Sequence, residues 1–190
     1  FYRGQDEKIK DFILDLLIIF FYLDPENIEL DLLNKLLSNL DFNEFLDDCY
    51  KNLINFEKKC FLIFINGDNS VKIHRLLQKD IKQFLQISNL TEKENDTRNK
   101  ILHTFINIFK EIYNLKRTLI DSTNLIIHMK KIFESSESKL EGENEVFILS
   151  YLGIYEDNMG RYDKALDFYN KSYNMSLRVF SNNPNHHHIG

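Results

Sequence analysis

The sequence predicts a mostly helical protein with one small β-hairpin. The 190 residues include only 6 Gly and 2 Pro, too few turn formers for a sandwich or barrel of many strands. Leucine, isoleucine and phenylalanine instead recur at helical spacing along several segments. One apolar run rich in aromatic and β-branched residues, 60–65, is followed by turn residues and a second extended stretch, 70–74, which locates the hairpin.

The N-terminal part of the chain predicts three helices. Residues 6–23 form the first, because a polar start leads into an apolar body, and Pro25 ends it. A second helix, about 28–39, carries its leucines on one face. Asp41 is the expected N-cap of a third helix that runs to about residue 54, with a glutamate three residues on.

The hairpin follows these helices. Residues 66–69, Asn-Gly-Asp-Asn, tolerate positive φ and form the expected turn between its strands. Apolar residues at helical spacing then predict a helix from His74 to Ile87. Three helices, a two-stranded wing and a further helix make a winged-helix-like module over residues 1–88.

The middle of the chain predicts a helical connector over residues 89–141. Ser88 to Asn95 is polar and charged and is expected to be a linker. Two amphipathic helices, about 97–115 and 118–134, follow it. Ser135 to Gly142 is a second polar break.

The C-terminal part predicts two antiparallel helices that pack closely. Gly153, Ala165 and Ser172 are small where the helices must approach each other, and Tyr162 and Tyr169 are expected to fill the gap beside them. Ala165 is the single alanine in the chain, and it falls where this packing needs a small side chain.

This spacing closely resembles a tetratricopeptide repeat (TPR), whose signature has Leu-Gly on the first helix and small and aromatic residues on the second. The matching positions are Leu149, Leu152, Gly153, Gly160, Tyr162, Ala165, Tyr169 and Ser172. Glu156 stands where the family usually has an aromatic residue, and the closing proline is absent. The resemblance implies that residues 142–190 are the first repeat, of kinesin-light-chain-like type, of an α-solenoid that is cut short and exposes an apolar face.

The N-terminal module resembles the winged helix that follows the nucleotide-binding domain in signal-transduction ATPases of the NB-ARC or STAND class. Residues 16–37, centred on Leu-Asp-Pro-Glu-Asn-Ile, carry one part of the resemblance. Ile73, His74 and Arg75 occupy the positions of that module's Met-His-Asp signature, from which Arg75 departs. Residues 126–128, Ile-Ile-His, resemble an element between winged helix and repeats.

The resemblance implies that His74 contacts the β-phosphate of bound ADP and helps to hold a closed, inactive state. An imidazole at the rigid end of a hairpin can donate to an anion. A structural role is the alternative, in which His74 caps the wing or donates to a backbone carbonyl. The chain contains no Gly-x-x-x-x-Gly-Lys-Ser/Thr loop. No cofactor is therefore expected in this segment, and ADP or ATP is expected only with an upstream nucleotide-binding domain.

Charge and composition argue against several other classes of protein. The net charge of −5 disfavours DNA or an anionic membrane as a partner, and the expected third helix is itself acidic. The longest apolar stretch, Phe12–Leu23, is too short to span a bilayer. Cys49 and Cys60 provide neither a disulfide framework nor zinc-ligand spacing, which favours a reducing, cytoplasmic location.

Two further motifs receive weaker interpretations. Residues 1–5 and the Glu143-Asn144-Glu145 segment imitate the arginine strand and Glu-x-Glu of arginine-specific ADP-ribosyltransferases. The surroundings are helical and lack the sheet that carries NAD in that family, so a position after such a domain is the least favoured interpretation. Residues 186–188, three adjacent histidines in a polar segment, cannot all point at one ion, so no metal site is expected.

Together these patterns favour a non-catalytic regulatory and protein–protein interaction segment of a STAND-type signalling ATPase. Its TPR array is expected to bind a protein or peptide on the concave face. Its winged helix is expected to relay that state to the upstream nucleotide-binding domain. The alternative is a stand-alone scaffold or cargo adaptor that never meets a nucleotide.

Overall fold

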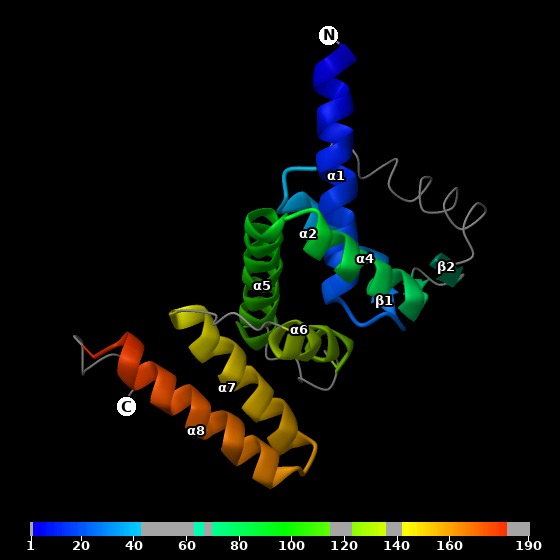
Figure 1. The fold of residues 1–190 in the computed structure, drawn as a ribbon. Helices are drawn as coiled ribbons and strands as arrows, with labels where there is room; N and C mark the ends of the chain where they lie inside the picture. The colour runs from blue at the N-terminus through cyan, green and yellow to red at the C-terminus, as the bar shows by residue number, and fades with distance from the viewer. Residues whose placement is uncertain (1, 43–62, 67–69, 115–122, 136–141, 182–190) are drawn as a thin grey trace. The chain divides into compact units, whose positions relative to one another are not determined.

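The computed structural model of the protein describes residues 2–42, 63–66, 70–114, 123–135 and 142–181. Over these residues the protein is mostly helical, with seven helices and one three-stranded antiparallel sheet (Figure 1). The prediction of a mostly helical fold is confirmed. The chain divides into two compact units, Phe1–Thr104 and Phe105–Gly190, and the expected domain limits at 88 and 141 stay predictions.

The first unit combines helices with the sheet. Its helices are α1 (Tyr2–Tyr22), α2 (Leu30–Ser38), α4 (Arg75–Ile87) and the first part of α5 (Thr91–Asn114). Its strands are β1 (Ile28–Glu29), β2 (Ile63–Asn66) and β3 (Ser70–Ile73). The core of this unit is aliphatic and aromatic, and its fully buried side chains include Phe20, Leu33, Leu37, Val71 and Ile73.

The hairpin is confirmed, and the sheet gains a strand that the sequence did not predict. β3 lies between β1 and β2, and Ile63 of β2 pairs with Ile73 of β3. Residues 28–29, expected to open the second helix, form β1 instead, where Ile28 pairs with Val71. Ile28 is fully buried, so pairing with a distant strand overrides the local helical pattern.

The end of α1 is held by α4. The last carbonyls of a helix have no partner within it, and the Gln78 side chain supplies one by donating to the carbonyl oxygens of Phe20 and Leu23, at 2.7 and 2.8 Å. Just beyond, the Pro25 carbonyl accepts from the amide of Ile73 at 2.8 Å. The break at Pro25 is thereby fixed against both the sheet and α4.

A buried carboxylate joins α1 to α5. Asp15 interrupts the apolar stretch of α1 and is only 1% exposed. It accepts a hydrogen bond from the hydroxyl of Thr97, and its Oδ2 lies 2.7 Å from the ammonium of Lys93. Nearby, the Tyr22 hydroxyl donates to Glu94 at 2.6 Å. Burial and the Glu94 carboxylate both raise the pKa of Tyr22, so this hydroxyl stays protonated as the donor.

These contacts explain why the predicted linker at 88–95 was wrong. Only the turn before residue 91 lies outside a helix, and α5 begins at Thr91. Lys93 and Glu94 hold its first turn against α1, and acidic residues in that turn suit the helix dipole. The first turn of α5, whose polar composition suggests exposure to solvent, is therefore a contact surface for α1.

The expected third helix, 41–54, lies almost wholly outside the described residues, as do Cys49, Cys60, residues 67–69 of the hairpin turn and the three histidines at 186–188. Asp41 itself is described, and it differs from the expected N-cap. Its φ is 64°, whereas an N-cap residue is extended. Its amide donates to Ser38, so Asp41 belongs to the turn that closes α2.

The second unit is helical over its described residues. It contains the last part of α5, α6 (Thr123–Ser135), α7 (Glu143–Asn158) and α8 (Tyr162–Val179). α7 and α8 run antiparallel and side by side (Figure 1), which confirms the expected helix pair. On another side of α7, Tyr151 stacks on Phe109 of α5 with ring centres 5.0 Å apart.

No helix within the described ranges combines the length and apolar character that crossing a membrane requires.

The Asp15 contacts predict a measurable loss of stability. We expect Asp15→Ala to lower the free energy of unfolding by about 2 kcal/mol, because it leaves a buried hydroxyl and an ammonium without their acceptor. Asp96→Ala is the matched control, because it removes an exposed carboxylate paired with Lys100 on α5 and should cost at most about 0.5 kcal/mol. Urea unfolding followed by circular dichroism measures both, and equal losses would contradict the assignment.

Candidate functional site

The functional residues expected from the sequence lie in both units, at His74 in the first and along α7 and α8 in the second. Within the described residues no group of three or more His, Cys, Asp or Glu side chains gathers in a way that could hold a metal ion. The Glu143-Asn144-Glu145 segment forms the first turn of α7 rather than a strand. His74 and the helix pair of α7 and α8 are the candidate sites among the described residues.

His74 caps α4. Its backbone is extended, with φ −66° and ψ 135°, and its Nδ1 accepts a hydrogen bond from the amide of Leu76 at 3.2 Å. This is a structural role, but the ring caps α4 rather than the wing, and it accepts from an amide rather than donating to a carbonyl. Because Nδ1 is the acceptor, the neutral ring carries its proton on Nε2. That nitrogen can still donate to an anion, and the side chain is exposed.

The charges beside His74 are partly compensated. Lys72 and Arg75 flank it, and both approach the carboxylate of Glu26, at 2.6 and 3.6 Å. A hydrogen bond from Lys72, together with its positive charge, lowers the pKa of Glu26. A phosphate group near His74 would therefore meet two cations that already share a carboxylate.

The helix pair in the second unit packs through small residues, as expected. A Cβ atom added to Gly153 would lie 2.5 Å from Cε1 of Tyr169, far inside van der Waals contact, so the ring occupies the space that glycine leaves. Ala165 is 2% exposed. Ser172 is also buried, and its hydroxyl lies 2.8 Å from that of Ser150 and 3.1 Å from the carbonyl of Val146. Leu149 and Leu152 are buried on α7.

Two other predicted positions have different roles. Gly160 lies in the turn between the helices with φ 70°, a left-handed conformation that glycine adopts without strain. Tyr162 was expected to fill the gap between the helices, and this was wrong, because its side chain is 70% exposed. Tyr162 stands at the exposed start of α8, and it is the Tyr169 ring that lies against Gly153.

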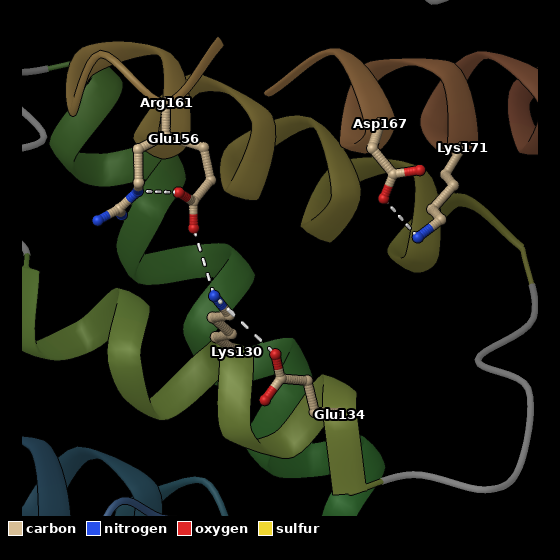
Figure 2. Close-up of polar contacts among 6 residues, drawn as sticks. All are labelled: Lys130, Glu134, Glu156, Arg161, Asp167 and Lys171. Atoms are coloured by element: carbon tan, nitrogen blue, oxygen red, sulfur yellow. Dashed lines mark hydrogen bonds and ion pairs between the residues drawn. The ribbon is translucent and has the colours of Figure 1, made fainter. Parts of the chain in front are cut away.

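Glu156 is the residue whose role sequence reasoning missed. Its side chain is fully buried, yet it is ionically paired with Arg161 and with Lys130, whose Nζ lies 3.3 Å away (Figure 2). Lys130 is on α6 and Arg161 lies in the turn before α8. One carboxylate therefore fastens α7 to α6 and to the turn that positions α8. The signal in the sequence is an acid in the place of an aromatic residue, five positions before an arginine.

Burial of Glu156 opposes its ionisation, but the hydrogen bonds and positive charges of Arg161 and Lys130 outweigh it. The pKa of Glu156 therefore lies below its ordinary value of 4.5, and the pKa of Arg161 is raised by the same contact. Since the folded-state pKa is depressed, the stabilisation is present above the unfolded-state value and is lost as the pH falls through the folded-state value.

A continuous apolar stripe lies exposed on α8. We call it the α8 stripe and define it by the five residues Tyr162, Leu166, Tyr169, Tyr173 and Leu177. Their spacing of three and four residues places them on one helix face. Their exposed fractions are 70, 59, 37, 53 and 41%. Contiguous apolar surface of this kind marks sites where other molecules bind.

The packing of Tyr169 on Gly153 predicts that the effect of Gly153→Ala on stability changes sign when the Tyr169 ring is removed. Gly153→Ala should destabilise the chain by about 1–2 kcal/mol, because the new methyl group displaces the packed ring. In a Tyr169→Ala background the same change should instead stabilise the chain, by up to about 1 kcal/mol, since alanine favours a helix over glycine. Urea unfolding of the four proteins gives the cycle, and additive effects would contradict the contact.

The Glu156 pair predicts a specific pH dependence. The excess stability of the wild type over Glu156→Gln should be largest above about pH 5 and should shrink as the pH falls below it, because protonation breaks the ion pairs. Asp167→Asn is the control, because it removes an exposed ion pair with Lys171 on α8. Chemical unfolding between neutral and acid pH measures the difference, and a gap that does not vary with pH would refute the assignment.

Comparisons of the chain with models of protein families, with curated proteins and with solved structures find no match. The likeness to STAND-type ATPases thus stays an expectation carried by the motifs at residues 16–37, at His74 and along the C-terminal helices.

Proposed function

We propose that the chain is a non-catalytic regulatory and protein-interaction segment of a STAND-type ATPase. The observation that carries the proposal is the α8 stripe, an exposed apolar face on a helix whose other face is tightly packed on α7. A surface of this kind is costly in water unless a protein covers it. Interaction with another protein surface is therefore the activity that the second unit supports best.

In this proposal α7 and α8 begin a TPR array. A repeat buries one face of its second helix against its own first helix and presents another face to a neighbouring helix. α8 is divided in this way, since Ala165 and Ser172 are buried while Leu166 and Tyr173 are exposed. The array would bind a protein or peptide on its concave face, in the cytoplasm.

For the first unit we propose a winged helix that reports to an upstream nucleotide-binding domain. The β2–β3 hairpin leads directly into α4, and His74 lies at this junction. Its Nε2–H is the donor that would meet the β-phosphate of ADP held by that domain. The segment alone supplies one donor and no phosphate-binding loop, so ADP or ATP belongs to the proposal only together with the upstream domain.

A stand-alone scaffold or cargo adaptor is the second candidate. The α8 stripe favours it as much as it favours the first, because a protein-binding face needs no nucleotide. The capping contact of His74 also gives this residue a sufficient structural role. The two candidates differ in what precedes Phe1 and in whether His74 senses ADP.

The first experiment reads the coding sequence upstream of Phe1 over roughly 300 residues, enough for a nucleotide-binding domain. A phosphate-binding loop after a predicted strand, with an acidic strand end downstream, supports the ATPase segment. A coding region without such a loop overturns it in favour of the adaptor.

Two variants of the encoded protein then separate sensing from capping. Asparagine is a good N-cap, so His74→Asn keeps the cap of α4 and removes the imidazole, whereas His74→Ala removes both. A nucleotide sensor predicts that both variants weaken ADP binding, by about tenfold for a lost charge-assisted hydrogen bond. Calorimetric titration of ADP measures this.

A purely capping role predicts a different pattern. His74→Ala would then lower the free energy of unfolding by up to about 1 kcal/mol, His74→Asn would be neutral, and both would bind ADP as the wild type does. That result would reject the nucleotide-sensing part of the proposal.

A further inference from the structure

α4 carries a row of basic side chains along one face. Residues 72–82 contain four basic residues and a single acid, Asp80, in a chain whose net charge is −5. Arg75, Lys79 and Lys82 are spaced by four and three residues, so they lie one after another on the same face of the helix. We call these three residues the α4 basic row.

The α4 basic row is open to solvent. The Arg75 side chain is 80% exposed, and Lys79 and Lys82 are exposed as well. α4 packs on the rest of the first unit through Ile81 and Leu85, which lie about a third of a turn away from the row. Another molecule can therefore meet the row without displacing the core contacts of α4.

The charge of the row is largely uncompensated. Arg75 lies 3.6 Å from one carboxylate oxygen of Glu26, but Lys72 holds the other oxygen at 2.6 Å, so one acid serves two bases. Across the part of the chain that the structure describes, neither Lys79 nor Lys82 forms an ion pair. The row therefore presents a net positive charge to solvent.

The row does not stabilise the helix that carries it. Arg75 is the first residue of α4, and the first turn contains no acidic residue. Because the positive end of the helix dipole lies at this end, a cation there is slightly destabilising. The same two positive potentials add up for a molecule that approaches from solvent, and they favour an anionic one.

An apolar edge runs beside the row. Leu76 and Ile87 are 56 and 75% exposed, and eleven residues, close to three full turns, separate them. They share a side of α4 about a quarter of a turn from the basic row, with Asp80 between them. Phe84, which is 46% exposed, lies further round on this side. A partner that covers α4 meets basic charges along one side and apolar side chains along the other.

We propose that this face of α4 binds an acidic amphipathic helix of another protein, whose carboxylates pair with the α4 basic row and whose apolar residues cover Leu76 and Ile87. The row from Arg75 to Lys82 is about 10 Å long, which matches two turns of a helix with acids at every third or fourth position. The inference goes beyond the proposed function, because it gives the first unit a partner of its own and needs neither ADP nor the α8 stripe.

Two other anionic partners match this face less well. A nucleic acid is a long line of phosphates, which an acidic chain repels beyond so short a row, and phosphates make no use of Leu76 and Ile87. An anionic bilayer requires a helix with a broad apolar face to insert. The apolar residues Ile81 and Leu85 of α4 are already buried in the protein.

Fluorescence anisotropy with a labelled synthetic helix tests the inference. The probe carries glutamates at every third or fourth position and leucines at the adjoining positions. The full 190-residue chain should bind this peptide at low salt with a dissociation constant in the micromolar range. Binding should weaken as salt is added, because exposed charges are screened.

Charge reversal separates the row from the overall charge of the chain. K79E/K82E should weaken binding of the acidic peptide at least about tenfold. K10E/K35E is the matched control, because it changes the net charge equally on α1 and α2, and it should weaken binding less than about twofold. All four lysines are exposed, so both variants should fold, and circular dichroism checks this.

Two more measurements test complementarity. A second peptide with lysines in place of the glutamates should bind K79E/K82E more tightly than it binds the wild type, because the signs of both surfaces are then exchanged. L76Q/I87Q should weaken binding of the acidic peptide at least about threefold, because it removes the apolar edge and leaves the row intact.

The outcomes decide between the inference and its alternatives. A wild type that does not bind the acidic peptide at low salt overturns the inference, as does an equal loss of binding in K79E/K82E and K10E/K35E. Tighter binding of short double-stranded DNA, or of vesicles of phosphatidylserine and phosphatidylcholine, overturns it in favour of that partner. None of these results touches the upstream coding sequence or the ADP titration, so the proposed function is tested separately.

Discussion

The close approach of α7 and α8 at Gly153 is the constraint on which the second unit depends. With a glycine there, the ring of Tyr169 lies directly on the α7 backbone, and this rotates α8 so that Ala165 and Ser172 face α7. The larger apolar residues of α8 then cannot face the same way. Tyr162, Leu166, Tyr173 and Leu177 are left at the surface, so the exposed apolar face follows from the packing of α8 on α7.

Each unit also contains a buried carboxylate that pairs with a cation on another helix. Asp15 forms an ion pair with Lys93 in the first unit, and Glu156 forms ion pairs with Lys130 and Arg161 in the second. Such pairs add little net stability compared with apolar residues of the same size, because desolvation offsets the attraction. Their effect is on specificity, since a helix that slid or rotated would leave a charge buried without its partner.

The two proposed roles of the chain place different demands on its surfaces. His74 supplies only one outward donor, beside cations that Glu26 already engages, so phosphate recognition would require a nucleotide-binding domain to supply most of the contacts. The α8 stripe is different, because its apolar residues all lie on one helix of the chain. The proposed protein interaction would therefore need only the segment itself, whereas the proposed nucleotide sensing would need a larger assembly.

Local patterns in the sequence predicted the helices, the hairpin and the small residues between α7 and α8, because periodicity and turn composition act over a few residues. They missed several features that are decided by a distant partner. Ile28 is in a strand because it pairs with Val71. The polar residues before Asp96 are helical because Lys93 forms an ion pair with Asp15 of α1. Glu156 is buried because cations from two other elements pair with it. Tyr162 is exposed for the same reason, since the rotation of α8 is set by Tyr169 on Gly153. The sequence by itself determined most of the helical and extended segments; the tertiary structure decided the state of residues 28–29 and 91–95 and which side chains are buried, because these depend on contacts between residues far apart in the chain.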